Sequence, residues 1–297
     1  MTMEVIPVSP ALAAEICGVN VSRPLDASTV AEIHKAWLEH LVLLIRGQDL
    51  DEEAFCRFSA IFGELEHAPP NEAKNTTSGG YVPDSPEITV ISNVIVDGVE
   101  IGSLGAGECA WHTDMSYNSV PPSASCLYAL EVPTEGGATG FLNMYAAYET
   151  LPRPLKEAIA GKTAIHDTTY TSAGSLRKGY EPVDDVRKAP GARHPLLRTH
   201  PETGRTALFL GRRQNSYIVG LPVDESEALL DEIWAHATQD KFTWHHHWKK
   251  GDLIVWDNRC AMHVRHAFDP AARRIMHRTQ IKGDAPFYKP EQPSRAA

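Results

Sequence analysis

The chain has 297 residues, of which 42% are hydrophobic and 22% are charged, the composition of an ordinary globular protein. Its formal net charge of −10 argues against the clustered basic surplus of nucleic-acid-binding proteins, and no apolar run is long enough to span a bilayer. The five cysteines are scattered, and the first residues lack the pattern of a signal peptide. We therefore expect reduced thiols in a cytoplasmic protein with no nucleic-acid or membrane partner.

The first 65 residues predict short strands and two helices. The first helix is expected to begin after Asp26 or Ser28, because apolar side chains follow at helical spacing. Residues 41–45 are a short apolar run that predicts a buried strand, and residues 51–62 predict a second helix. We therefore expect N-terminal helical and strand elements over residues 1–65.

Residues 66–87 are rich in proline, asparagine, glycine, serine and threonine, so we expect a long loop or lid there. From residue 88 the chain is mainly β, with helical patterns at residues 144–160 and 223–238. The expected strands cover residues 88–91, 124–130, 206–210, 242–248, 253–256 and 274–281. Many short strands separated by turn signals predict an α+β, mainly β fold with a closed or two-sheet core, such as a jelly roll.

No internal repeat or low-complexity linker divides the chain. We therefore expect a single domain over residues 1–284, with its core mainly in residues 88–284. Residues 285–297 carry three prolines and predict a mobile tail.

The most informative local pattern is the pair His112 and Asp114. Residues two apart on a strand share a face, so both side chains could reach one ion. Two imidazoles and one carboxylate on one face of a metal hold non-haem Fe(II) and leave positions open for a substrate and O₂. The third ligand would come from a distant strand, where His263 is the candidate and His266 is its rival.

Two arginines follow His263 on one expected strand. Arg274 and Arg278 are four residues apart, so they share a face of that strand. A guanidinium keeps its charge and binds a carboxylate through two hydrogen bonds, and an inward arginine in an apolar barrel needs an anion. The pair indicates two anions, a cosubstrate and a substrate. Pairing with an Asp or Glu of the chain itself is an equal alternative.

The chain resembles the taurine / 2,4-dichlorophenoxyacetate dioxygenase family of Fe(II)- and 2-oxoglutarate-dependent oxygenases. The matching segments are Arg46-Gly47-Gln48, Phe62-Gly63, Ile91-Ser92-Asn93, Trp111-His112-Thr113-Asp114, Gly136-Gly137-Ala138-Thr139, Ala146-Ala147-Tyr148, Trp256-Asp257-Asn258-Arg259 and Arg273-Arg274-Ile275-Met276-His277-Arg278. The sequence departs from the family pattern at Ala138, where an aspartate is common. The resemblance implies a catalytic domain built on a double-stranded β-helix, or jelly-roll, core flanked by helices.

The resemblance also implies the residues of the site. His112, Asp114 and His263 are the expected Fe(II) ligands, with O₂ binding at the same metal. Thr139 and Arg274 are expected to bind the far carboxylate of the cosubstrate 2-oxoglutarate.

Three further residues are expected near the substrate. Arg278 falls where the family binds the acidic group of its substrate, and Tyr117 and His67 occupy positions where family members contact the substrate. The run His245-His246-His247 invites a metal-site interpretation, but its context favours an amphipathic strand without a metal role.

We therefore expect a dioxygenase that hydroxylates a C–H bond of a small anionic organic acid, an aryloxyalkanoate-like carboxylate or a sulfonate, and releases succinate and CO₂. A heteroatom on the hydroxylated carbon would cause the product to break apart. One alternative is a metal-binding jelly-roll sensor or binding protein without oxygenase activity. Another is a desaturase or cyclase that uses the same mechanism. Homodimers or tetramers are the assemblies that the resemblance implies.

Overall fold

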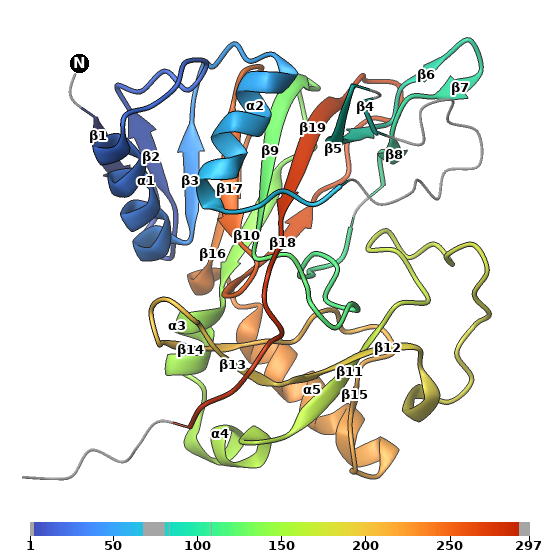
Figure 1. Ribbon diagram of the computed structural model, residues 1–297. Helices are drawn as coiled ribbons and strands as arrows, with labels where there is room; N and C mark the ends of the chain where they lie inside the picture. The colour runs from blue at the N-terminus through green and yellow to red at the C-terminus, as the bar shows by residue number, and fades with distance from the viewer. Residues whose placement is uncertain (1–2, 68–80, 83, 108, 291–297) are drawn as a thin grey trace, which may run out of the picture.

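Figure 1 shows the computed structural model, which describes residues 3–67, 81–82, 84–107 and 109–290. The helices are α1 (Ala27–His40), α2 (Glu52–Ser59), α3 (Met144–Glu149), α4 (Arg153–Ile159) and α5 (Val223–Ala237). The strands are β1 (Glu4–Pro7), β2 (Ala14–Cys17), β3 (Val42–Ile45), β4 (Tyr81–Val82), β5 (Ser85–Ser92), β6 (Ile95–Val96), β7 (Val99–Glu100), β8 (Ser103–Leu104), β9 (Ala124–Glu131), β10 (Thr139–Asn143), β11 (Thr163–Asp167), β12 (Gly191–Pro195), β13 (Leu197–Thr199), β14 (Thr206–Leu208), β15 (Tyr217–Ile218), β16 (Thr243–His246), β17 (Leu253–Asp257), β18 (Ala261–Arg265) and β19 (Ile275–Ile281). The fold is therefore mainly β with few helices.

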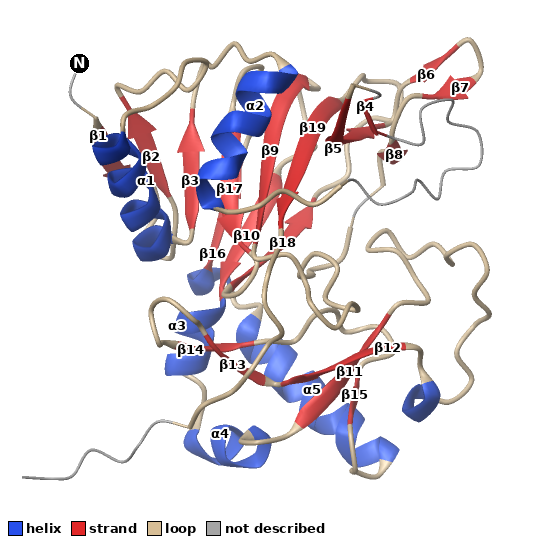
Figure 2. Cartoon of the chain, in the orientation of Figure 1, coloured by secondary structure: helices blue, strands red, loops and turns tan. Residues whose placement is uncertain are grey.

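The sequence explains where both N-terminal helices begin. The Asp26 side chain accepts a hydrogen bond from the backbone N of Thr29 and caps α1, as predicted. Asp51 caps α2 in the same way through the backbone N of Ala54. Both helices bury their apolar sides, with Trp37 of α1 fully covered, and both lie on one face of the large sheet (Figure 2).

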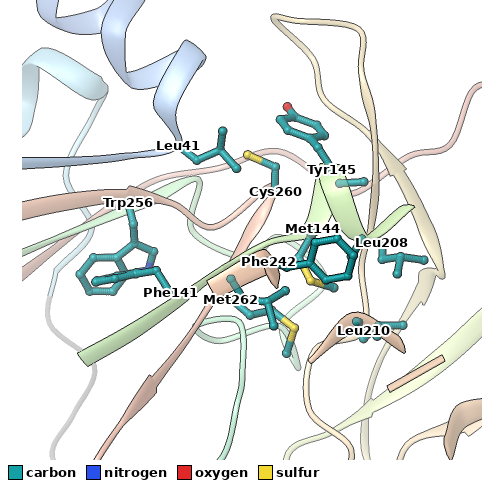
Figure 3. Packing of buried hydrophobic residues seen from close by; sticks show 14 of the residues in the cluster. Leu41, Phe141, Met144, Tyr145, Leu208, Leu210, Phe242, Trp256, Cys260 and Met262 are labelled. Carbon is teal, nitrogen blue, oxygen red and sulfur yellow. The ribbon is translucent and has the colours of Figure 1, made fainter. Parts of the chain in front are cut away.

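Two sheets contribute to one apolar core. The main sheet has nine strands in the order β1-β2-β3-β17-β9-β19-β5-β4, with β8 beside β5, and a smaller sheet has the order β16-β10-β18. The ring centroids of Phe141 in β10 and Trp256 in β17 lie 5.6 Å apart, and Figure 3 shows both in the shared cluster. Since β10 pairs with β18 in a register that sets Phe141 opposite His263, this packing also positions His263.

A second group of elements lies below the main sheet in Figure 1 and contains α3, α4 and α5. It also holds the three-stranded sheet β12-β11-β15 and the hairpin β13-β14. Buried side chains of α3, β14 and α5 belong to the same apolar cluster as those of β10 and β17, so the two groups are packed together. The cavity described below is lined by both groups.

The loop prediction for residues 66–87 was partly wrong. β4 begins at Tyr81 and β5 at Ser85, and both strands belong to the main sheet. Residues 68–80 and 83 lie outside the described residues. The other predicted helices and strands are present with shifts at their ends, and the helical pattern at residues 144–160 is divided into α3 and α4. The strands that were not predicted from the sequence are β6, β7, β8, β10, β11, β12, β13, β15 and β18.

The prediction of a mobile tail over residues 285–297 was wrong for the first part of this segment. The backbone N of Thr199 donates to the carbonyl of Phe287 at 2.8 Å, and the backbone N of Lys289 donates to Thr199 Oγ1 at 2.9 Å. The first part of this segment is therefore held against β13. Residues 291–297 lie outside the described residues.

No helix in the described part of the chain is long and apolar enough to cross a membrane. All five cysteines are free thiols, and Cys109, Cys126 and Cys260 are buried. Burial raises the pKa of Cys56 to about 11 and that of Cys126 to about 12. These two thiols therefore stay protonated near neutral pH.

Candidate active site

One cavity of about 1370 Å³ collects nearly all of the predicted site residues. Its lining includes His112, Asp114, Tyr117, Thr139, His263, Arg274 and Arg278. His67 is the exception, because it is not part of this lining. Its side chain is 77% exposed, and its Nε2 lies 3.9 Å from Glu87 Oε1.

Three of these side chains converge on one point. The Nε2 atoms of His112 and His263 each lie 3.9 Å from Asp114 Oδ1, and the possible ligand atoms of the three residues all lie within 4.8 Å of one another. Two imidazole nitrogens and one carboxylate oxygen in this arrangement could hold a metal ion. The rival His266 is directed elsewhere, with its Nε2 3.0 Å from Nδ1 of His245.

The convergence is produced by an isolated backbone bridge rather than by a strand. The backbone N of His112 donates to the carbonyl of His263 at 3.0 Å, and the reverse hydrogen bond measures 2.9 Å. Asp114 follows in a turn, where Met115 has a φ of 44°. The prediction that His112 and Asp114 share a strand face was therefore wrong, because the short segment bridges to β18 and then turns at once.

Hydrogen bonds orient the ligand candidates. Nδ1 of His112 lies 2.8 Å from the carbonyl oxygen of Ala110 and donates to it, which leaves Nε2 as the unprotonated nitrogen facing Asp114. Ser125 Oγ donates to Asp114 Oδ2 at 2.7 Å, and Asn258 Nδ2 donates to Ser125 Oγ at 2.9 Å. Nothing in the sequence pattern marked Ser125, because an isolated buried serine on a strand carries no periodic signal.

The electrostatics keep these side chains in the ionisation states that a metal requires. Burial alone would raise the pKa of Asp114, but Arg278, His263 and His112 outweigh it and lower that pKa to about 2. Burial, reinforced by His112, lowers the pKa of His263 to about 3, and burial also lowers the pKa of His112. At neutral pH the site therefore presents one carboxylate and two neutral imidazoles.

A buried guanidinium without a partner lies in the same cavity. Arg274 is 2% exposed, and its side chain forms no hydrogen bond or ion pair with any other described residue. Burial and the neighbouring Arg265 lower the pKa of Arg274 to about 9. The backbone N of Arg274 donates to Asn93 Oδ1 at 3.0 Å, which anchors the chain beside the guanidinium. A buried cation of this kind requires an anion, and pairing with an Asp or Glu does not supply it among the described residues.

Thr139 lines the same cavity as Arg274 and has a hydroxyl group that can donate a hydrogen bond. Its Oγ1 accepts a hydrogen bond from Nε1 of Trp248 at 2.9 Å, so the hydroxyl hydrogen remains free to donate. The sequence did not single out Trp248, since it lies beyond the end of β16 and outside every motif.

The other two predicted substrate residues, Arg278 and Tyr117, also line the cavity. Nη1 of Arg278 lies 3.4 Å from Asp114 Oδ1, so this guanidinium is partly engaged by the carboxylate of a candidate ligand. The ring of Tyr117 lies 4.4 Å from the guanidinium carbon of Arg177, in a loop that also lines the cavity. Arg278 therefore lies beside one of the three converging side chains, whereas Tyr117 contacts Arg177 in the cavity wall.

The three consecutive histidines have separate environments. His246 is 2% exposed, and its Nε2 lies 2.9 Å from Asp252 Oδ2. His245 contacts His266, as described above, and His247 is exposed. In the described residues these side chains do not gather at one point with the metal-ligand geometry of the cavity.

The chain is similar to a known protein family and to several of its members. The family model of the taurine catabolism dioxygenase TauD, TfdA family matches residues 4–280. The chain is 34% identical to the alpha-ketoglutarate-dependent 2,4-dichlorophenoxyacetate dioxygenase of Cupriavidus pinatubonensis, over 96% of this chain and 99% of that protein. It is also 34% identical to pentalenolactone F synthase of Streptomyces arenae, over 96% and 97% of the two chains. The crystal structure of a taurine dioxygenase from Burkholderia xenovorans is similar with a TM-score of 0.77, at 33% identity over 96% of this chain and 91% of that one.

The fold and site therefore define a 2-oxoglutarate-dependent dioxygenase, an oxidoreductase that uses Fe(II), 2-oxoglutarate and O₂. The chain belongs to the taurine catabolism dioxygenase TauD, TfdA family.

Proposed function

We propose that this dioxygenase hydroxylates a C–H bond of a small anionic organic acid, an aryloxyalkanoate-like carboxylate or a sulfonate. The observation that carries the proposal is the pair of arginines in one cavity. Arg274 has no hydrogen-bond or ion-pair partner for its side chain among the described residues, and Arg278 lies beside Asp114. Two relatives named for 2,4-dichlorophenoxyacetate and taurine support an acidic substrate. Where the hydroxylated carbon bears an ether oxygen or a sulfonate, the product would break apart.

The donor set fits Fe(II). His112, Asp114 and His263 would hold it, because the two imidazoles are neutral, the carboxylate is ionised, and Ser125 and Ala110 fix the orientation of their partners. When bound, iron with 2-oxoglutarate supplies the activation of O₂ for attack on a C–H bond. The protein contributes the ligand geometry and the placement of both organic acids.

The remaining roles follow from charge and hydrogen bonding. Arg274 and the free hydroxyl hydrogen of Thr139 would bind the far carboxylate of 2-oxoglutarate, which would supply the anion that the buried guanidinium lacks. Arg278 would bind the acidic group of the substrate, and the ring of Tyr117 would pack against its body. Holding both molecules beside one metal turns their encounter into an oriented reaction within a single complex.

The architecture supports a jelly-roll core within one catalytic domain over residues 1–284. The order of the main sheet interleaves early and late strands, and β10 and β18 pair in the smaller sheet, as expected when two sheets are wound together. The five free thiols are consistent with a cytoplasmic location.

Succinate formation tests the proposed function. The purified protein is supplied with Fe(II), ascorbate, 2-oxoglutarate and a panel of aryloxyalkanoates, alkanoates and sulfonates. We expect one acid to raise succinate release well above the rate without substrate, and His112→Ala to abolish it. His247→Ala is the control, because His247 is exposed outside the cavity. Full turnover by His112→Ala, or no acid in the panel that stimulates the wild type, would refute the proposal.

A further inference from the structure

His166, a residue of β11, is a buried polar side chain that the proposed reaction does not use. It is 2% exposed and lines the cavity, and neither ring nitrogen has a hydrogen-bond partner among the described residues. Its ring stacks on Phe209 with centroids 5.3 Å apart and meets the edge of His194 at 5.0 Å. Packing therefore holds the imidazole in place while its donor and acceptor remain unsatisfied, which is unusual in a buried position.

The backbone around this ring is shaped to admit it. Gly211 has a φ of 65°, and a Cβ there would lie only 2.1 Å from His166 Nδ1 and 2.8 Å from Ser116 Oγ. The carbonyl oxygen of Gly211 accepts a hydrogen bond from the backbone N of Thr113 at 3.0 Å. The backbone at Gly211 is therefore bonded to the residue that lies between the two proposed iron ligands His112 and Asp114. The absence of a side chain at Gly211 therefore leaves the space that the imidazole occupies.

The neighbouring His194 differs from His166, because one of its ring nitrogens is already hydrogen-bonded. His194 Nε2 lies 2.9 Å from the carbonyl oxygens of both Ser116 and Asn118, so it donates to the backbone of the same turn. His194 has an evident structural role in holding that turn. His166 has none of these contacts among the described residues, and both of its ring nitrogens are buried without a partner at the cavity wall.

Arg212 adds a charge to the same part of the cavity. Its Nη2 donates to the carbonyl of Asp167 at 3.0 Å, whereas its Nε is buried without a partner, and no carboxylate of the described residues forms an ion pair with it. The Asp167 carboxylate is already used by the backbone N of Thr169 and by Nδ2 of Asn215. The adjacent Arg213 differs, since it pairs with carboxylates outside this cavity.

Arg212 and Arg278 both line the cavity that holds the proposed iron ligands, and Arg278 Nη1 lies 3.4 Å from Asp114 Oδ1. Arg278 comes from β19, whereas Arg212 follows β14 in the second group of elements. The cavity therefore offers a molecule near the metal two cations from different parts of the fold, in addition to Arg274.

We propose that His166 and Arg212 form a second recognition subsite for the substrate, which takes a carboxylate or a similar oxyanion. This inference rests on the proposed function and narrows its substrate class from a simple acid to a diacid. One acidic group would bind Arg278, and the other would bind the guanidinium of Arg212 beside the imidazole of His166 in the cavity wall. The diacid would then satisfy both groups that the protein leaves unpaired.

Binding of matched acids tests the subsite without turnover. The protein is loaded with Mn(II) and 2-oxoglutarate in the absence of O₂, and affinities are measured by isothermal titration calorimetry. The probes are 4-carboxyphenoxyacetate against 4-methylphenoxyacetate, and octanedioate against octanoate, so each diacid has a monoacid of similar shape. We expect the wild type to prefer at least one diacid by about tenfold or more, the usual effect of a charged hydrogen bond.

Three variants assign this preference to the subsite. Arg212→Met should bring the affinities for the diacid and the monoacid to within about twofold of each other, because the charged hydrogen bond to the second acidic group is lost. His166→Phe keeps the stacking on Phe209 but removes both nitrogens, and it should reduce the preference. Arg213→Gln is the matched control and should retain the full preference, because Arg213 pairs outside the cavity.

The outcomes separate this inference from the proposed function. No diacid preference in the wild type, or a preference that survives Arg212→Met, would overturn the subsite. Succinate release stimulated by a monoacid in that case would leave the proposed function intact. A preference lost in Arg212→Met but kept in Arg213→Gln would support the subsite, even if no acid in the panel stimulates turnover.

Discussion

Replacing Ser125 by alanine should weaken metal binding without touching a ligand. Ser125 is fully buried, and its hydroxyl lies 2.7 Å from Asp114 Oδ2 and 2.9 Å from Asn258 Nδ2. A hydrogen bond to a charged group contributes about 1.5–3 kcal/mol, which corresponds to a change of about 10–150-fold in an equilibrium constant. Loss of such an outer partner usually lowers metal affinity by about 10–100-fold. We therefore expect the Mn(II) dissociation constant of Ser125→Ala to rise by about 10–100-fold.

The assay is calorimetric titration of the metal-free protein with Mn(II). Ser123→Ala is the matched control, because Ser123 is 6% exposed and its hydroxyl donates to the carbonyl of Lys282 at 2.9 Å, away from the ligands. That variant should lose some stability but keep the wild-type metal affinity. If Ser125→Ala binds Mn(II) as tightly as Ser123→Ala does, the assigned role of Ser125 in orienting Asp114 is wrong.

Three further predictions follow from the same structure. Arg278→Ala should raise the dissociation constant of the acidic substrate by about 10–100-fold and change that of 2-oxoglutarate far less, and equal losses would contradict this division. Thr139→Val should raise the KM for 2-oxoglutarate by about tenfold with little change in the KM for the substrate, as steady-state kinetics would show. Burial alone would raise the pKa of Asp257, but Arg259 and His200 hold it below its ordinary value. The ionised Asp257 carboxylate therefore stabilises the fold above the unfolded pKa of about 4, and this stabilisation is lost as the pH falls below that value. Asp257→Asn should lower the free energy of unfolding by about 3–5 kcal/mol at pH 7, and denaturant unfolding should show that this free energy then depends less on pH in the acid range.

The sequence was informative where local chemistry decides the structure. Asp26 predicted the start of α1 because a short acidic side chain can cap a helix from its own neighbourhood. The strand β3 was predicted from its short, continuous apolar run, and it is fully buried. The spacing of His112 and Asp114 and the presence of a distant His263 indicated a metal site, and the structure brings the three side chains together.

Features formed between distant segments were not predictable in this way. The bridge between His112 and His263 was taken for a strand, because only the three-dimensional fold shows that the two backbones meet for a single residue pair. Ser125 and Trp248 orient other groups through one hydrogen bond each, and such contacts leave no pattern in the sequence. His67 was included through the family resemblance alone, and the structure leaves it exposed.

The most direct test of the central claim is the visible charge-transfer absorption that arises when 2-oxoglutarate chelates Fe(II) in the protein without O₂. We expect the wild type to develop this absorption and His263→Ala to lose it. His266→Ala should keep it, because His266 Nε2 is directed to His245 rather than to Asp114. An unchanged absorption in His263→Ala, or its loss in His266→Ala, would contradict the assignment of His112, Asp114 and His263 as the iron ligands.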